Sequence, residues 1–135
     1  MLSKILKVLF EKKKEDHIDV KNECSEPLLM VRLFVNERLC AWMQCVIQSE
    51  TTILIGDIWH HNENRDYNRG YGSLMMENLL AYAKEHNFSY IYGNLSKVDL
   101  DHKERLHHFY RKFGFAVTEY PERQGNYYGI IELHL

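Results

Sequence analysis

The chain has 135 residues, of which 45% are hydrophobic, and its formal net charge is −2 at pH 7. This composition argues against a disordered chain, and the near-neutral charge gives no general attraction to nucleic acid. The length suits a modest core, so we expect one domain over residues 1–135. Three cysteines without a C-x-x-C spacing argue against a disulfide framework. Because we also find no signal peptide and no apolar run of membrane length, we expect a cytoplasmic protein.

The N-terminal part of the sequence predicts one helix and then a β-meander. Apolar residues at helical spacing from Leu2 to Phe10 predict a short amphipathic helix. Its lysines admit a second reading, a membrane or nucleic-acid patch, but we interpret them as the solvated face of the helix. Runs rich in apolar and β-branched residues follow with short connections, as is typical of antiparallel strands. The expected strands are 17–20, 28–35, 39–48 and 51–61.

The C-terminal part alternates helices and strands. Apolar residues recur every three or four positions after Gly72, which predicts a helix that ends near Asn87. A second helix is predicted to begin at a capping box of Asp101 and Glu104 and to end at Gly114. Further strands are expected at 88–95, 115–120 and 127–135, the last two joined by a loop over 121–126. The sequence therefore predicts a mixed α/β (α+β) sheet with an antiparallel N-terminal meander, a central β-α-β crossover and two C-terminal strands.

The stretch NRGYGS, residues 68–73, has the features of a phosphate site at the start of a helix. The first amides of a helix have no partner inside it, the helix dipole favours negative charge there, and glycine leaves the backbone accessible. The stretch is not a P-loop, because Ser73 and Leu74 follow Gly72. It is not a Rossmann fingerprint either, because Met75 stands at the third glycine position. By itself it favours an ordinary turn.

A second segment changes that interpretation. HHFYRKFGF, residues 107–115, places an aromatic pair on a helix that leads through Gly-Phe into a strand. Together with LIGDIW and RGYGSLMM, and in the same order, it resembles the GNAT superfamily of N-acetyltransferases over about residues 53–115. The resemblance implies a GNAT-like fold and the transfer of an acetyl group from acetyl-CoA to a primary amine by direct attack within a ternary complex.

The resemblance also implies which residues bind the cofactor. The acyl-CoA pyrophosphate would lie on the glycine segment, the pantetheine arm would pair with the end of the preceding strand, and one tyrosine would lie near the thioester sulfur. These residues are Tyr67, Asn68, Arg69, Gly70, Tyr71, Gly72 and Ser73 for the pyrophosphate, Ile58, Trp59 and His60 for the arm, and Tyr110 for the sulfur. Three positions depart from the family pattern. Tyr67 stands where a Gln or Arg is usual, and Lys103 and Leu106 stand where an Asn and a small residue are common.

Acetyl transfer to an amine needs a proton acceptor, a donor to the carbonyl oxygen and an acid for the leaving thiolate. An alkylammonium has a pKa of about 10.4 and must lose a proton before it attacks. A strand N–H near Ile58 would serve the oxygen, and Tyr110, with a reference pKa of about 10, would protonate the sulfur unless it is only a packing ring. The identity of the proton acceptor stays open. The candidates are Asp57, His60, His61, Glu63, Asn94 positioning a water, or a chain of waters.

Several alternatives remain at this point. Because no base is assigned, a catalytically weak acyl-CoA-binding or sensor module is the second candidate function. The pairs His60–His61 and His107–His108 match no metal motif, so we expect no metal and expect His107 and His108 to flank the apolar stripe of their helix. The amine acceptor, a small molecule or a protein, is not readable, and we expect no nucleic-acid or membrane partner. The apolar strand at 127–135, if exposed, would allow a homodimer.

Overall fold

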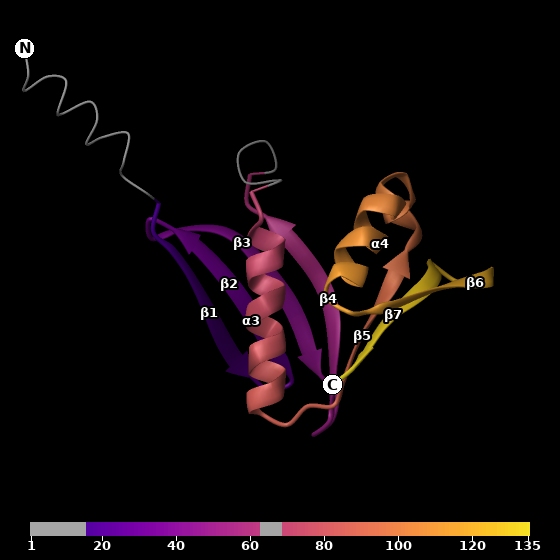
Figure 1. Ribbon diagram of the computed structural model, residues 1–135, viewed down its shortest axis with the longest axis horizontal. Coiled ribbons are helices and arrows are strands. Elements are labelled where there is room, and N and C mark those ends of the chain that lie inside the picture. The colour runs from indigo at the N-terminus through magenta and orange to yellow at the C-terminus, as the bar shows by residue number, and fades with distance from the viewer. Residues whose placement is uncertain (1–15, 63–68) are drawn as a thin grey trace, which may run out of the picture.

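The computed structural model describes residues 16–62 and 69–135 of the chain. Seven strands form one mixed sheet in the order β1-β2-β3-β4-β5-β7-β6 (Figure 1). The strands are β1 (Ile18–Ser25), β2 (Leu28–Val35), β3 (Arg38–Ile47), β4 (Thr52–His60), β5 (Tyr90–Ser96), β6 (Ala116–Gln124) and β7 (Tyr127–His134). The helices are α3 (Tyr71–Glu85), the 3₁₀ helix η1 (Lys97–His102) and α4 (Lys103–Lys112). The predicted mixed sheet is confirmed, whereas the helix predicted between Leu2 and Phe10 lies outside the described residues.

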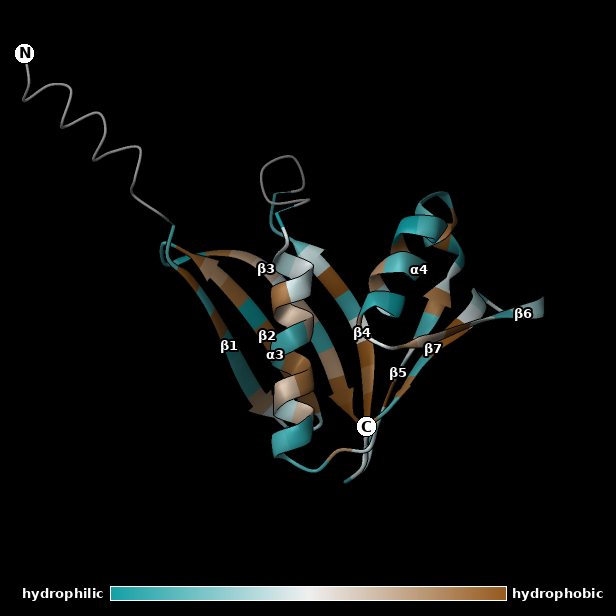
Figure 2. Cartoon of the chain, viewed as in Figure 1, coloured by the Kyte–Doolittle hydropathy of each residue, from teal (hydrophilic) through white to brown (hydrophobic). Residues whose placement is uncertain are grey.

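The first four strands form the predicted antiparallel meander. The β2–β3 connection consists of Asn36 and Glu37, whose φ angles are 50° and 68°. Two left-handed residues in succession give a tight hairpin turn that follows the natural twist of the strands, and Asn tolerates this conformation better than most residues. Along β2, buried residues alternate with half-buried or exposed ones, and Figure 2 shows apolar and polar residues alternating along these strands. This pattern is typical of a sheet that is covered on one face.

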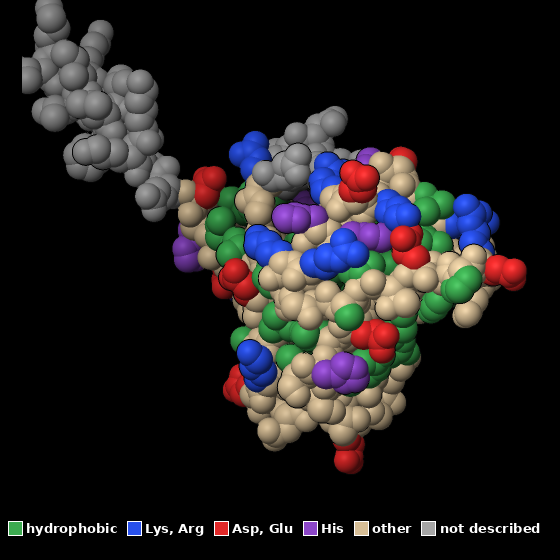
Figure 3. All heavy atoms as spheres, turned by 45° about the vertical axis from the view of Figure 1, so that its right-hand side comes forward, with side chains coloured by type: hydrophobic (Ala, Val, Ile, Leu, Met, Phe, Trp, Pro, Cys, Tyr) green, Lys and Arg blue, Asp and Glu red, His purple; other side chains and the backbone are tan. Residues whose placement is uncertain are grey.

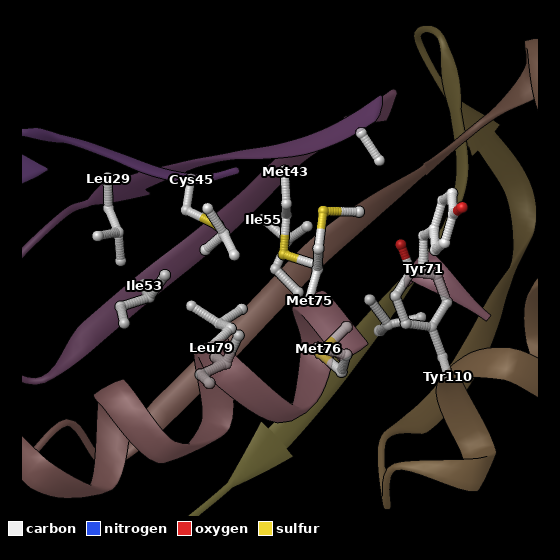
Figure 4. Close-up of a cluster of buried hydrophobic side chains, with 14 of the residues drawn as sticks. Leu29, Met43, Cys45, Ile53, Ile55, Tyr71, Met75, Met76, Leu79 and Tyr110 are labelled. Carbon is white, nitrogen blue, oxygen red and sulfur yellow. The ribbon is translucent and has the colours of Figure 1, made fainter. Parts of the chain in front are cut away.

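α3 crosses from β4 to the parallel strand β5 and packs on the covered face of the sheet. Figure 4 shows the apolar side chains of α3 against those of the meander, with Leu79 near Ile53 and Met75 near Met43. Full burial of one such Leu or Met side chain stabilises the fold by about 1.5–3 kcal/mol. The buried residues of α3 are Tyr71, Met75, Met76, Leu79 and Ala83. Of the three cysteines, Cys40 and Cys45 lie in this core, whereas Cys24 is exposed on β1.

α3 and α4 lie on the same face of the sheet (Figure 1). On the opposite face, the described residues place no helix, and we call this the open face. Contacts of polar and aromatic side chains, within β5 and from β5 to neighbouring segments, stabilise it. The Tyr90 hydroxyl donates to Glu132 over 2.6 Å, the Tyr92 hydroxyl donates to Gln48 over 2.6 Å, and the two tyrosine rings stack with centroids 5.4 Å apart. Contacts of this kind between strands each stabilise a sheet by about 0.2–1 kcal/mol.

The strand at the C-terminal end of the described chain is not an edge strand, so the exposed apolar edge expected at 127–135 is wrong. β7 lies between β5 and β6, and the sheet edges are β1 and β6. The expected loop over 121–126 is also too long, because β6 continues to Gln124 and turns through Gly125 and Asn126. Pro121 therefore lies within a strand. β6 tolerates it because an edge strand leaves one row of N–H groups unpaired, and the ladder is irregular between Glu119 and Gln124.

The predicted capping box of α4 is also wrong. Asp101 lies inside η1, the N-cap of α4 is His102, and its side chain makes no capping hydrogen bond. The chain instead enters a short 3₁₀ helix directly after β5, where the Ser96 hydroxyl accepts the N–H of Val98 over 3.4 Å. The helix end was predicted correctly, since Gly114 has a φ of 90° in the left-handed region that favours glycine after a helix.

Candidate functional site

β4 and β5 separate partway along the sheet. Their parallel pairing runs only from Thr52 with Tyr90 to Ile55 with Gly93, and the described residues form no further pair between them. Beyond this point β4 stays paired with β3 to His60, while β5 stays paired with β7 to its end. We call the region between residues 57–60 of β4 and 94–96 of β5 the fork. Among residues 16–62 and 69–135, no strand lies next to the backbone N–H and C=O groups on its inner edges.

A β-bulge in β4 lies at the start of the fork. Gln44 of β3 pairs with Asp57 and Cys45 pairs with Ile55, so Gly56 is an additional residue in β4. A Cβ atom at Gly56 would lie 3.0 Å from the carbonyl oxygen of Gln44, which explains why glycine stands there. Bulges bend a strand and increase its twist. The bulge therefore accounts for the direction in which β4 leaves β5.

The N-terminus of α3 has the features of an anion site. Gly70 is the N-cap with a φ of 78°, and within the described residues no side chain caps this end. The amides of the first helical turn have no partner inside the helix and carry the positive end of its dipole. A Cβ atom at Gly70 would meet nothing within 4 Å, so the backbone is open on this side. An anion can therefore approach the amides directly.

Lys112 of α4 adds a positive charge to this anion site. Its Nζ atom donates to the hydroxyl of Ser73 over 3.1 Å and lies 5.3 Å from the ring centroid of Phe113. Figure 3 shows that Lys, Arg and His side chains gather on the upper half of the visible face of the molecule. The sequence analysis did not single out Lys112, because its contact with Ser73 joins two helices 39 residues apart.

Gly72 has a different surrounding from Gly70. A Cβ atom at Gly72 would lie 3.3 Å from Cε1 and 3.5 Å from Cζ of Phe109. The absent side chain therefore allows α4 to pack against the first turn of α3. Glycine at this position brings the two helices together, and it keeps the anion site close to the aromatic residues of α4.

Tyr110 lies at the same end of the core, with 8% of its surface exposed. Figure 4 shows it extending from α4 near Tyr71, and its ring meets the edges of Phe109 and Phe115 with centroids 5.4 and 5.6 Å away. Its hydroxyl oxygen is not among the fully buried side-chain polar atoms that lack a hydrogen-bond partner in the described part of the chain. Burial raises its pKa above the usual value, and Asp99 raises the pKa further. The hydroxyl therefore keeps its proton at neutral pH and is available as a donor.

Two carboxylates lie in the same region. Asp57 directly follows the bulge, and Asp99 lies in η1 just after β5. Burial raises the pKa of Asp99, His102 lowers it, and Asp101 and Asp57 raise it again. The sequence analysis missed Asp99. The signal that could have found it is Ser96 followed three positions later by Asp99, the S-x-x-D pattern of a helix start.

The remaining predicted residues are distributed over both faces. Ile58 pairs with Met43 and faces the helices, whereas Trp59 pairs with Trp42 on the open face. The two indole rings stack with centroids 6.2 Å apart, and Trp59 is 51% exposed. His60 is half-buried at the end of β4. Of the other predicted residues, Arg69, His61 and Asn94 are exposed, while Tyr67, Asn68 and Glu63 lie outside the described residues.

The two histidines of α4 differ in burial, so the expectation that both flank the apolar stripe is wrong. His107 is 5% exposed, and its Nε2 atom lies 2.9 Å from the hydroxyl of Tyr128. Burial lowers the pKa of His107. His108 is exposed. Over residues 16–62 and 69–135, no group of three metal-ligating side chains lies together, and no helix is long and apolar enough to cross a membrane.

Comparisons with known proteins agree with this geometry. The family model described as the acetyltransferase (GNAT) family matches residues 2–115. The Bacillus subtilis protein YocC is 42% identical over 50 residues, which is 37% of this chain and 30% of the length of YocC.

Solved structures share the fold. A GNAT family acetyltransferase from Elizabethkingia anophelis with acetyl-CoA bound superposes with a TM-score of 0.66 and 14% identity, covering 90% of this chain and 100% of that one. The PaiA N-acetyltransferase of Thermoplasma acidophilum, in complex with coenzyme A, gives a TM-score of 0.63 and 15% identity, covering 81% and 62% of the two chains.

Proposed function

Because the chain belongs to the acetyltransferase (GNAT) family, we propose that it binds acetyl-CoA and transfers the acetyl group to a primary amine by direct attack, with both substrates bound together. One observation carries the proposal. The uncapped N-terminus of α3, the hydroxyl of Tyr110 and the inner edges of the fork belong to elements that meet at one end of the core. Acetyl-CoA has a pyrophosphate, a thioester and an arm with amide groups. The anion site would bind the pyrophosphate, the proton donor would serve the thioester sulfur, and the unpaired strand backbone would bind the amides of the arm.

The residues present suit the cofactor in two places. Its pyrophosphate would accept from the amides of Gly70, Tyr71, Gly72 and Ser73, with Lys112 and Arg69 nearby. Tyr67 and Asn68, which precede this segment, remain part of the proposal. The amides of the pantetheine arm would pair with the backbone of β4 at Ile58, Trp59 and His60, because no other described strand pairs with that edge.

The chain's own groups supply the chemistry around the reacting carbon. Acetyl-CoA, when bound, supplies the activated acetyl group. An N–H of β4 near Ile58 would donate to the carbonyl oxygen as it gains negative charge. The hydroxyl of Tyr110 would give its proton to the sulfur as the thiolate leaves, since burial keeps that proton on the oxygen at neutral pH.

Tyr110→Phe tests the proposal. We expect acetyl-CoA binding by calorimetry to persist while thiol release with a panel of amines falls by about 10²-fold, because a general acid contributes about 10²–10⁴-fold. The matched control is Tyr127→Phe, which removes a hydroxyl from an exposed tyrosine and should change neither measurement.

The two candidate functions predict different outcomes. If the wild type binds acetyl-CoA but releases no thiol with any amine, the chain is a binding or sensor module. If it neither binds acetyl-CoA nor releases thiol, the proposal is wrong in both forms.

A further inference from the structure

The strand β7 contains a bulge beside the fork. Ser96 at the end of β5 pairs with Tyr127 of β7, and Leu95 pairs with Gly129. Tyr128 is therefore an additional residue in β7, and we call this place the β7 bulge. Tyr128 and Gly129 are both buried, although successive residues of a regular strand point to opposite faces. Bulges redirect side chains and are common next to functional sites. Here the bulge turns the ring of Tyr128 to the face that carries the helices.

Tyr128 meets the middle of α4 through His107. The Tyr128 hydroxyl lies 2.9 Å from Nε2 of His107, and the two rings stack with centroids 5.9 Å apart. Both residues are buried, with 6% and 5% of their surfaces exposed. A hydrogen bond between buried groups is unfavourable to break, because water does not readily replace the lost partner. The contact therefore fixes both side chains.

α4 has few buried residues that hold it on the sheet. They are His107 and Tyr110, whereas α3 has a longer buried stripe. Lys103 at the start of α4 pairs with Glu119 of β6, but more than a third of each of these side chains is exposed. Exposed ion pairs restrain a helix only weakly. The contact between His107 and Tyr128 is thus the buried polar connection between α4 and the sheet.

His107 and Tyr110 lie on the same side of α4. Residues three positions apart on a helix are neighbours on its surface, and both of these are buried. A rotation or a slide of α4 would therefore move the two side chains together. The hydrogen bond to Tyr128 opposes such a movement, because hydrogen bonds depend steeply on distance and angle.

We propose that His107 is a positioning residue for Tyr110. It fastens α4 to the β7 bulge and so holds the Tyr110 hydroxyl at the place from which it protonates the leaving sulfur. This inference rests on the proposed acetyl transfer. His107 contacts none of the reacting atoms and exchanges no proton with the substrates. It acts on the rate because a small displacement of a catalytic group lowers the rate strongly.

Three single variants test the contact. In His107→Leu we expect kcat, measured as thiol release with the best acceptor of an amine panel, to fall by about tenfold. This is part of the 10²–10⁴-fold that a general acid contributes. Tyr128→Phe keeps the ring, removes the hydroxyl and should lower kcat to the same extent. His107→Gln places an amide near the position of Nε2 and should restore most of the rate. The affinity for acetyl-CoA, measured by calorimetry, should not change in any of them.

The Tyr110→Phe background separates positioning from general damage to the fold. If His107 acts through the Tyr110 hydroxyl, His107→Leu should lower kcat by about tenfold when the hydroxyl is present and should have no further effect when it is absent. A merely structural role would lower kcat by the same factor in both backgrounds. The matched control is His108→Gln, which changes the exposed neighbour and should leave kcat unchanged.

The outcomes keep the two proposals apart. If His107→Leu keeps the wild-type kcat, or loses the same factor in both backgrounds, the positioning role is wrong and the acetyl transfer stands. If His107→Leu does not fold, Tyr128→Phe in the two backgrounds decides the question in the same way. If Tyr110→Phe keeps the wild-type kcat, the role of Tyr110 is wrong, and so is the positioning role. If the wild type neither binds acetyl-CoA nor releases thiol, the acetyl transfer itself is wrong.

Discussion

Among single residues, Lys112 places a positive charge at the candidate anion site although it belongs to no motif of the sequence. It bridges α4 to the first turn of α3 through Ser73, so its charge lies beside the uncapped amides. Arg69, which the resemblance did include, lies on the other side of the N-cap and is exposed. The residue pattern thus indicates the backbone part of the candidate anion site, whereas the contribution of Lys112 follows only from the packing of the two helices.

Lys112→Ala should weaken acetyl-CoA binding by about tenfold, because charge-assisted hydrogen bonds contribute roughly 1.5–3 kcal/mol and this one is exposed to solvent. The loss should shrink at high salt, which screens exposed charges. Calorimetry at two salt concentrations measures both effects. Lys84→Ala, at the opposite end of α3, is the control and should leave affinity unchanged. Equal affinity of Lys112→Ala and the wild type would remove Lys112 from the anion site.

His107 makes the stability of the fold depend on pH. Burial lowers its pKa in the folded chain, Arg111 and Lys103 lower it further, and Glu119 opposes them. As the pH falls below about 6.5, the unfolded chain takes up the proton first, so stability that is present above this pH is lost as the pH approaches the folded pKa. We expect Tm to fall between about pH 7 and pH 5.

The pH dependence is measured by thermal unfolding over that range. In His107→Gln the fall in Tm should be shallower, because no buried imidazole then has to become charged. The neighbouring exposed residue provides the control, and His108→Gln should keep the wild-type slope. An unchanged slope in His107→Gln would show that other groups dominate the acid sensitivity.

Among the elements, the contact between α3 and α4 depends on Gly72. A methyl group at this position would lie 3.3 Å from the ring of Phe109, closer than an ordinary contact. Gly72→Ala should therefore destabilise the fold by about 1–2 kcal/mol, the usual effect of overpacking, besides weakening acetyl-CoA binding. Denaturant unfolding measures the first effect and calorimetry the second.

A double variant separates packing from cofactor contact. Phe109→Leu removes the ring that the new methyl group would meet, so in the Gly72→Ala/Phe109→Leu protein part of the lost stability should return relative to the sum of the single variants. If the stability changes are strictly additive, the two residues do not interact and the close contact does not limit packing.

The elements also show how far the sequence predicts the fold. The positions of β2, the α3 crossover and the Gly114 helix end follow from local patterns that tertiary contacts support. The predictions of a helix cap at Asp101 and a loop at Pro121 were wrong, because local sequence rules do not include the preceding 3₁₀ helix or the position of a strand at the edge of the sheet. An edge strand accepts a proline, and a serine hydroxyl can start a 3₁₀ helix before the expected cap.

The sequence indicates the part of the candidate site that lies in contiguous motifs, but not the part that depends on contacts between distant residues. The glycine segment and Tyr110 lie in contiguous motifs that are visible in the sequence, and the described part of the glycine segment lies next to α4. Asp99, Lys112 and the pairing of Trp42 with Trp59 depend on strand register and helix contact. No local pattern encodes these, because they arise from residues far apart in the chain.

At the scale of the whole molecule, the sheet consists of two groups of strands that are joined by the short pairing between β4 and β5. In the described part of the chain, the sheet hydrogen bonds that join β1–β4 to β5, β7 and β6 are confined to the parallel pairing of residues 52–55 with 90–93. The Tyr92–Gln48 hydrogen bond lies at the same place. A ligand that binds along the fork and the start of α3 contacts both parts. Its binding energy should then appear as increased stability of the entire fold.

Acetyl-CoA at about 100 times its dissociation constant should stabilise the folded chain by about 2.7 kcal/mol. For a chain of this size the rise in Tm is about 8–10 °C. Thermal unfolding with increasing ligand measures it, and ATP, which has phosphates but no thioester arm, is the control. A rise as large with ATP would mean that the arm makes no contribution along β4.

The burial of two cysteines and the exposure of the third have a practical consequence for these measurements. Burial raises the pKa of the Cys45 thiol to about 12, and Cys40 lies in the same core, so the folded protein presents Cys24 alone to alkylating reagents. Since β1 is separated from β4 by two strands, a fluorophore on Cys24 would report unfolding from a place remote from the fork. The same residue would consume one equivalent of a disulfide indicator in any assay of released coenzyme, and Cys24→Ser would remove that background.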